Sequence, residues 1–234
     1  MQQANHITDN PLKWLGYATD NILPNGGFGA VLARAGVGKT SLLVQIALNS
    51  MLRNQAVLHI SLDDPVKKIN LWYKEIFQLL TKDFKMDQER QLWETILPFR
   101  FILTMKVDGF SMLRLEERVR DLVEQDIFSP RMIIIDGLPF DGSAKDTLLE
   151  LKPFINHLGA HAWLTVKTHR HEEPGPDGFP IQISDIKDLF DTIIELHPEG
   201  ESIYIRNLKG GSGQTNTERL ILDPSTMLIQ KKQG

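Results

Sequence analysis

The chain has 234 residues, a formal net charge of −4 and no cysteine, and 41% of its residues are hydrophobic. These values are ordinary for a globular domain with a real core, and the absence of cysteine excludes disulfides and thiolate metal sites. The net charge does not indicate a nucleic-acid partner, although it leaves room for a local basic patch. No apolar run approaches the length of a membrane span and the N-terminus does not resemble a signal peptide, so we expect a cytoplasmic protein.

The first 24 residues are mixed and polar. We expect residues 1–24 to form an N-terminal segment that packs on the core through Trp14, Leu15 and Tyr17. Residues 25–234 contain no internal repeat and no low-complexity linker, which predicts a single domain.

From residue 28 onward, apolar strand patterns alternate with helical patterns. The predicted strands cover 28–32, 57–62, 100–104, 131–137 and 162–166, and the predicted helices cover 41–48, 66–80, 87–97, 111–124 and 144–158. Four further strands joined by tight turns are predicted at 191–196, 202–208, 218–222 and 227–230. This order predicts an α/β fold with a mostly parallel central sheet flanked by helices, and with antiparallel strands at its C-terminal edge.

Two helices carry predictions about their buried faces. In the helix at 66–80, the apolar face consists of Ile69, Trp72, Tyr73, Ile76, Phe77 and Leu80. In the helix at 111–124, the residues expected to point inward are Leu113, Val119, Leu122 and Val123.

The most informative stretch, residues 33–41, reads ARAGVGKTS. It matches the phosphate-binding pattern G-x-x-x-x-G-K-[ST], except that Ala33 replaces the first glycine, which is tolerable where φ is negative. Lys39 is expected to reach the β- and γ-phosphates, and the Thr40 hydroxyl to contact Mg²⁺. An ordinary glycine-rich turn is the alternative, but the strand before the loop and the helix after it favour a phosphate loop. The predicted nucleotide-binding residues are Ala35, Gly36, Val37, Gly38, Lys39, Thr40 and Ser41.

Acidic residues end two of the predicted strands, at the sheet edge where ligands bind in open α/β folds. Asp136 follows four apolar residues and is predicted to act as the Walker B aspartate beside Thr40, the alternative being a turn into Gly137. Asp63 is predicted to activate the attacking water. Asp64 is then expected to cap the next helix, with Pro65 as its first residue.

Three other polar residues are candidates with open alternatives. His169 follows the strand at 162–166 and is either a sensor of the γ-phosphate or a solvated loop histidine. Arg206 and Lys209 lie at a strand end before a glycine turn, where one of them could reach a neighbouring subunit's phosphates or both could be ordinary surface charges. Alternation along a strand places them on opposite faces, so they are not expected to serve one phosphate together.

In this order, the motifs resemble the RecA/KaiC family of P-loop ATPases over residues 20–232. The matching segments are 25–27, 61–65, 132–136, 189–194, 203–212 and 220–229. The resemblance implies a RecA-like P-loop NTPase core that binds ATP and Mg²⁺, and the choice of ATP over GTP rests on it alone. It implies Lys39 and Thr40 on phosphate and magnesium, Asp136 on magnesium, and Asp63 as the acid that activates water. Lys209 matches the basic finger that acts in trans, which implies a homo-oligomer, for example a hexamer.

Three positions depart from the family pattern. Ala33 replaces glycine, Asp63 replaces the usual catalytic glutamate, and Asn207 stands where lysine is frequent. The aspartate shortens the reach to water by one methylene, which predicts slow hydrolysis. The asparagine weakens the match to the intersubunit finger.

The function predicted from the sequence is ATP hydrolysis coupled to a change of conformation or assembly, in a regulatory role with an unidentified protein partner. One alternative is a DNA-dependent motor or recombinase of the hexameric helicase or RadA type. Nucleic acid is disfavoured because the loops at 137–146 and 168–180 carry few unopposed cations. A second alternative is a nucleotide-dependent interaction module that does not hydrolyse. A small-molecule kinase is less favoured because no arginine-rich lid segment is present.

Overall fold

The computed structural model describes residues 12–15, 17, 22–169, 172, 175, 177–211 and 220–232. Most of the predicted N-terminal segment therefore lies outside the described residues, as does the side chain of Trp14. Leu12 and Tyr17 are buried in the same core cluster as the central strands, and Leu15 packs against that cluster.

Within the described residues, nine strands form one sheet in the order β3-β2-β4-β5-β1-β6-β7-β8-β9. The strands are β1 (Phe28–Ala33), β2 (Val57–Ser61), β3 (Arg100–Thr104), β4 (Met132–Asp136), β5 (His161–Lys167), β6 (Thr192–Glu199), β7 (Ser202–Lys209), β8 (Leu220–Leu222) and β9 (Ile229–Lys231). The six strands from β3 to β6 are parallel, and β7, β8 and β9 continue the sheet in antiparallel fashion. The predicted α/β fold with antiparallel strands at its C-terminal edge is confirmed.

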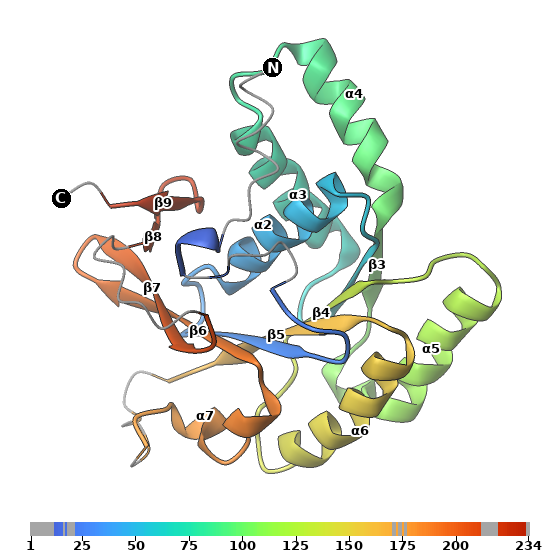
Figure 1. The fold of residues 1–234 in the computed structure, drawn as a ribbon, viewed down its shortest axis with the longest axis vertical. Coiled ribbons are helices and arrows are strands. Elements are labelled where there is room, and N and C mark those ends of the chain that lie inside the picture. Colours follow the sequence, from blue (N-terminus) through green and yellow to red (C-terminus); the bar gives the residue numbers. More distant parts are fainter. Residues whose placement is uncertain are drawn as a thin grey trace.

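Helices cover both faces of the parallel part of the sheet (Figure 1). One face carries α2 (Lys39–Leu52), α3 (Val66–Leu80) and α4 (Met86–Ile96), and the other carries α5 (Met112–Glu124), α6 (Ala144–His157) and the short α7 (Ile181–Ser184). Successive strand residues enter different clusters: Ile133 packs on the α5–α6 side and Ile134 on the α2–α3 side. This burial on both faces explains the run of three β-branched residues in β4, Ile133–Ile135.

The structure corrects two local predictions. Leu113 is 68% exposed, whereas Met112, Leu115 and Val119 form the buried face of α5. These three follow the i, i+3, i+7 spacing of a single helical face, and Leu113 lies outside it. At the start of α3, Pro65 is the N-cap residue rather than the first helical residue, and no side chain among the described residues caps the helix.

Asp64 is therefore not the cap that the sequence predicts. Its carboxylate instead accepts a hydrogen bond from Lys68 Nζ at 2.9 Å, while its backbone N–H donates to Ser61 Oγ at 3.0 Å. The turn after β2 is thus fixed by its own polar groups, which leaves Asp63 facing the end of β4.

The sheet order determines which loops meet. β5 lies between β1 and β4, and β2 lies on the other side of β4. Because these four strands are parallel, the residues that follow each of them gather at one edge of the sheet. That edge holds the phosphate loop, Asp136, Asp63 and the end of β5.

Candidate functional site

The phosphate loop connects β1 to α2 and has the backbone conformation that its glycines allow. Gly36 and Gly38 have φ angles of +77° and +113°, which disfavour any other residue. A Cβ at Gly38 would also lie 2.5 Å from Leu222 Cδ2. Ala33, in contrast, is the last residue of β1, where extended backbone accommodates alanine in place of the usual glycine.

Lys39 lies over this loop. Its Nζ donates to the backbone oxygens of Ala33 at 3.0 Å and Arg34 at 3.1 Å. Burial lowers the pKa of Lys39, the charges of Asp136 and Asp63 oppose this shift, and Lys167 adds to it. The ammonium is thus partly desolvated, so a phosphate group placed here would gain a strong electrostatic contact.

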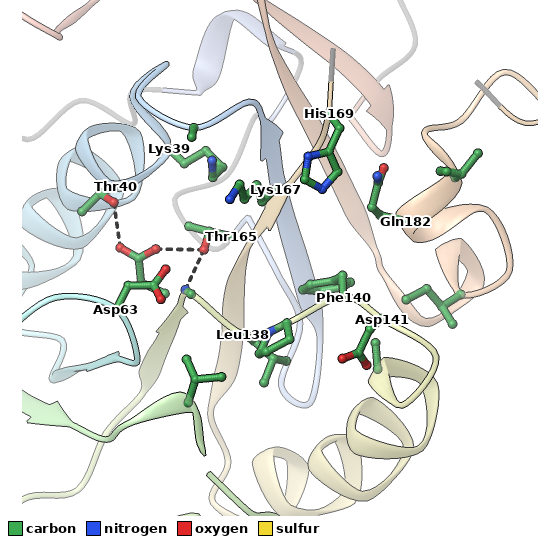
Figure 2. A pocket seen from close by; sticks show the side chains of 18 of the residues that line it. Lys39, Thr40, Asp63, Leu138, Phe140, Asp141, Thr165, Lys167, His169 and Gln182 are labelled. Atoms are coloured by element: carbon green, nitrogen blue, oxygen red, sulfur yellow. Dashed lines mark hydrogen bonds between the residues drawn. The ribbon is translucent and has the colours of Figure 1, made fainter. Parts of the chain in front are cut away.

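Asp136 is the centre of a hydrogen-bonded group at the end of β4. Thr40 Oγ1 donates to its Oδ2 at 2.7 Å, and Thr165 Oγ1 donates to its Oδ1 at 2.8 Å. Thr165 Oγ1 also accepts the backbone N–H of Gly137 at 3.0 Å (Figure 2). Burial would raise the pKa of Asp136, but the polar groups of His59, Thr40 and Thr165 outweigh this and hold the pKa below its ordinary value. The carboxylate is therefore ionised at neutral pH.

The pair of Thr40 and Asp136 fits a magnesium ion. A hydroxyl and an ionised carboxylate are hard oxygen donors at the mouth of the phosphate loop, and Mg²⁺ in such sites takes its remaining ligands from phosphate and water. Thr40 and Asp136 are therefore the residues that would hold the metal.

Asp63 faces the same group from the end of β2 (Figure 2). Its carboxylate packs against Gly137, where an added Cβ would lie 2.7 Å from Asp63 Oδ2. Gly137 has a φ of +91°, which reinforces the need for glycine. Burial raises the pKa of Asp63, as do the neighbouring charges of Asp136 and Asp64, while Lys167 and Lys39 lower it. Asp63 is therefore a stronger base than an ordinary aspartate.

These residues line one pocket of about 950 Å³. Lys167 and His169 enter it from the end of β5, with the Lys167 ammonium close to that of Lys39 in Figure 2. Beyond the phosphate loop, the wall of the pocket includes Leu138, Phe140, Asp141, Glu172, Gln182 and Asp185. His169 is exposed, so its position is compatible both with a sensor of the γ-phosphate and with a solvated loop histidine.

The two basic candidates of β7 lie elsewhere. Lys209 pairs with Ile193 near the start of β6, at the sheet edge opposite the phosphate loop, and its Nζ donates to Lys187 O at 3.0 Å. Arg206 Nη1 lies 3.9 Å from Glu195 Oε2, and Arg206 Nη2 lies 3.4 Å from Glu199 Oε2. The structure thus brings Lys39, Thr40, Asp136, Asp63 and His169 together, and leaves Lys209 and Arg206 apart from them.

Sequence reasoning missed Thr165, Lys167 and His59. The sequence shows Thr165 and Lys167 as polar residues at the end of an apolar strand. It does not show which residues they contact, because those contacts follow from the position of β5 between β1 and β4. His59 gave no local signal, because it sits in the middle of a buried strand.

The fold and this loop define a P-loop NTPase. Residues 2–146, more than half of the chain, match the family model described as AAA domain, and the chain belongs to that family. The match ends at the start of α6, before β5 and the antiparallel strands. A search of curated proteins finds no match to the sequence. Among the described residues, no helix is long and apolar enough to cross a membrane.

Proposed function

We propose that this protein is a RecA/KaiC-like ATPase that hydrolyses ATP slowly with Mg²⁺ at the shared edge of β1, β2, β4 and β5. The observation that supports this most directly is the contact of Thr40 with Asp136 at 2.7 Å, with the Asp63 carboxylate packed against the next residue, Gly137. ATP, rather than another nucleotide, follows from the resemblance to that family.

The phosphate loop and Lys39 bind and orient the triphosphate. Backbone N–H groups of the loop point at its oxygens, and the Lys39 ammonium offsets negative charge that develops during transfer. Thr40 and Asp136 would hold Mg²⁺, which would add to the neutralisation of the phosphate charge.

Asp63 acts as the general base. It accepts a proton from a water molecule whose oxygen forms a bond to the γ-phosphorus, while the bond from that phosphorus to the β–γ bridging oxygen breaks. The products are ADP and inorganic phosphate. The raised pKa of Asp63 strengthens it as a base. Its short side chain limits how closely it approaches the water, which makes turnover slow.

Lys209 serves a second copy of the chain. Because it lies at the sheet edge opposite its own phosphate loop, it can reach a nucleotide only across a subunit contact. We propose a homo-oligomer in which ATP changes conformation or assembly, as a regulatory ATPase does. We place this activity in one domain, residues 25–234, with residues 1–24 as an accessory segment.

The test compares two lysines of the same pocket. Lys39→Ala should weaken ATP binding about 100-fold and reduce phosphate release to background, because it removes the half-buried ammonium that would contact the phosphates. Lys145→Ala, which removes an exposed lysine from the pocket wall, is the matched control and should change both by less than about twofold. Wild-type binding and turnover in Lys39→Ala would refute the proposal.

The same assay separates the alternatives. Stimulation of phosphate release by single-stranded DNA would favour a DNA-dependent motor. We expect none, because Asp141, Glu172 and Asp185 on the pocket wall repel phosphate backbones. Tight ATP binding with no phosphate release would instead favour a nucleotide-dependent interaction module.

A further inference from the structure

His59 is completely buried in the middle of β2 and carries an unsatisfied polar atom. Its exposed fraction is 0%, and its Nε2 has no hydrogen-bond partner among the described residues. Buried nitrogen atoms without a hydrogen-bond partner are rare in folded proteins, so each one needs a physical explanation.

The two ends of the imidazole face two different groups. Nδ1 lies 3.2 Å from the Tyr73 hydroxyl of α3, and Nε2 lies 3.9 Å from Asp136 Oδ2. Tyr73 is also completely buried, and burial raises its pKa, so the phenol keeps its proton. That proton can be donated to Nδ1, which leaves the imidazole hydrogen on Nε2, directed at the carboxylate.

The Tyr73 ring is held in place from behind by Arg100. The Arg100 guanidinium carbon lies 4.5 Å from the centre of the ring, and its Nη2 donates to Asn70 Oδ1 at 2.6 Å. A cation stacked on the ring face and tied to the same helix limits rotation of the phenol. The position of the hydroxyl oxygen is therefore set by packing.

We propose that His59 is a positioning residue for Asp136, with Tyr73 fixing its tautomer. Thr40 and Thr165 hold the two carboxylate oxygens from one side, and the His59 Nε2–H faces Oδ2 from the other. The 3.9 Å separation is about 1 Å longer than an ordinary hydrogen bond, so a small movement of either side chain closes it. This inference rests on the proposed function only where it assigns Mg²⁺ to Asp136.

The first test needs neither metal nor nucleotide. In protein labelled with ¹⁵N-histidine, long-range ¹H–¹⁵N spectra report which ring nitrogen carries the hydrogen, and His59→Gln assigns the His59 signals. We expect the Nε2–H tautomer in the wild type and a mixture of tautomers in Tyr73→Phe. A hydrogen on Nδ1 in the wild type would overturn the proposal.

The second test measures how much Mg²⁺ strengthens binding of a fluorescent ADP analogue. His59→Phe keeps the ring volume but removes the donor, and should reduce the Mg²⁺ enhancement about 10-fold, within the range found for groups that orient metal ligands. Binding without Mg²⁺ should stay within about twofold of the wild type, because Lys39 and the loop are untouched. His59→Gln, whose amide places an N–H near the position of Nε2, should restore most of the enhancement.

A histidine that only packs predicts a different pattern. Phenylalanine would then be tolerated as well as glutamine, and any loss would affect binding with and without Mg²⁺ alike; either result would overturn the proposal. His161→Gln, a histidine at the opposite sheet edge, controls for a general effect of losing an imidazole. If His59→Phe does not fold, Tyr73→Phe carries the same test. If the wild type binds no nucleotide, the proposed function fails while the tautomer result still decides the role of His59.

Discussion

The carboxyl edge of β4 and the end of β7 carry charged groups in opposite circumstances. At β4, Asp136 is held by hydroxyls from two other elements and faces Asp63 across Gly137. At β7, Arg206 and Lys209 are partly exposed, and each contacts acidic or carbonyl oxygens of its own chain. The first region has its polar groups assembled within one chain, whereas the second would act only if another subunit supplied a phosphate.

The largest effect is expected from a substitution of Asp136, at the centre of the polar group at the end of β4. Asp136→Asn removes the charge that Thr40, Thr165 and His59 are arranged around, and an amide donates where the hydroxyls also donate. Phosphate release at saturating ATP should fall about 100-fold or more. A rate within fivefold of the wild type, measured by a coupled phosphate assay, would show that Asp136 has no role in hydrolysis.

The next effect tests the contact between Asp63 and Gly137. Gly137→Ala forces a left-handed backbone on alanine and drives a Cβ into the carboxylate, so we expect a loss of ~1–3 kcal/mol in unfolding free energy. Hydrolysis should fall about 10-fold or more because Asp63 is displaced. Gly142→Ala, in open space on the same loop, is the control and should leave both unchanged.

The β7 region should behave differently. Lys209→Ala should leave ATP binding within about twofold of the wild type, because Lys209 is not part of its own chain's pocket. Phosphate release should drop about 10-fold or more only at protein concentrations where oligomers form, in line with basic fingers supplied in trans. Arg206→Ala is the control. A protein that stays monomeric with ATP bound, by light scattering, would contradict this role.

The smallest effect concerns the pH dependence of hydrolysis. Asp63 must be ionised to act as a base, so the rate falls as pH drops through its raised pKa. Asp64→Asn removes a negative neighbour, which lowers that pKa and moves the acid limb to lower pH. Lys167→Gln removes a positive neighbour and moves it to higher pH. If the acid limbs of the two variants moved in the same direction, a group other than Asp63 would control the pH dependence.

The sequence predicts the elements of this fold better than it predicts their contacts. The boundaries of α3 and β3 match the prediction, and the phosphate loop and Asp136 stand where their patterns indicate. The prediction that Leu113 points inward is wrong, because neighbouring apolar residues on a helix permit more than one buried face.

The partners of Asp136 could not be predicted for a different reason. Thr165 and His59 contact it because β5 and β2 flank β4, and local sequence patterns do not state which strands are neighbours. Lys209 was found from the strand end and the resemblance alone, and its role stays a prediction. Strand order is therefore the information needed to predict which of these motifs lie together in one site.

The most direct test of the account is the single-turnover rate of phosphate release by Asp63→Asn, with ATP bound to excess protein and Mg²⁺ present. We predict unchanged ATP binding and a rate about 100-fold below that of the wild type, because the substitution removes the base and leaves the phosphate loop intact. A wild-type rate in this variant would contradict the central claim that hydrolysis takes place between Asp63 and Asp136.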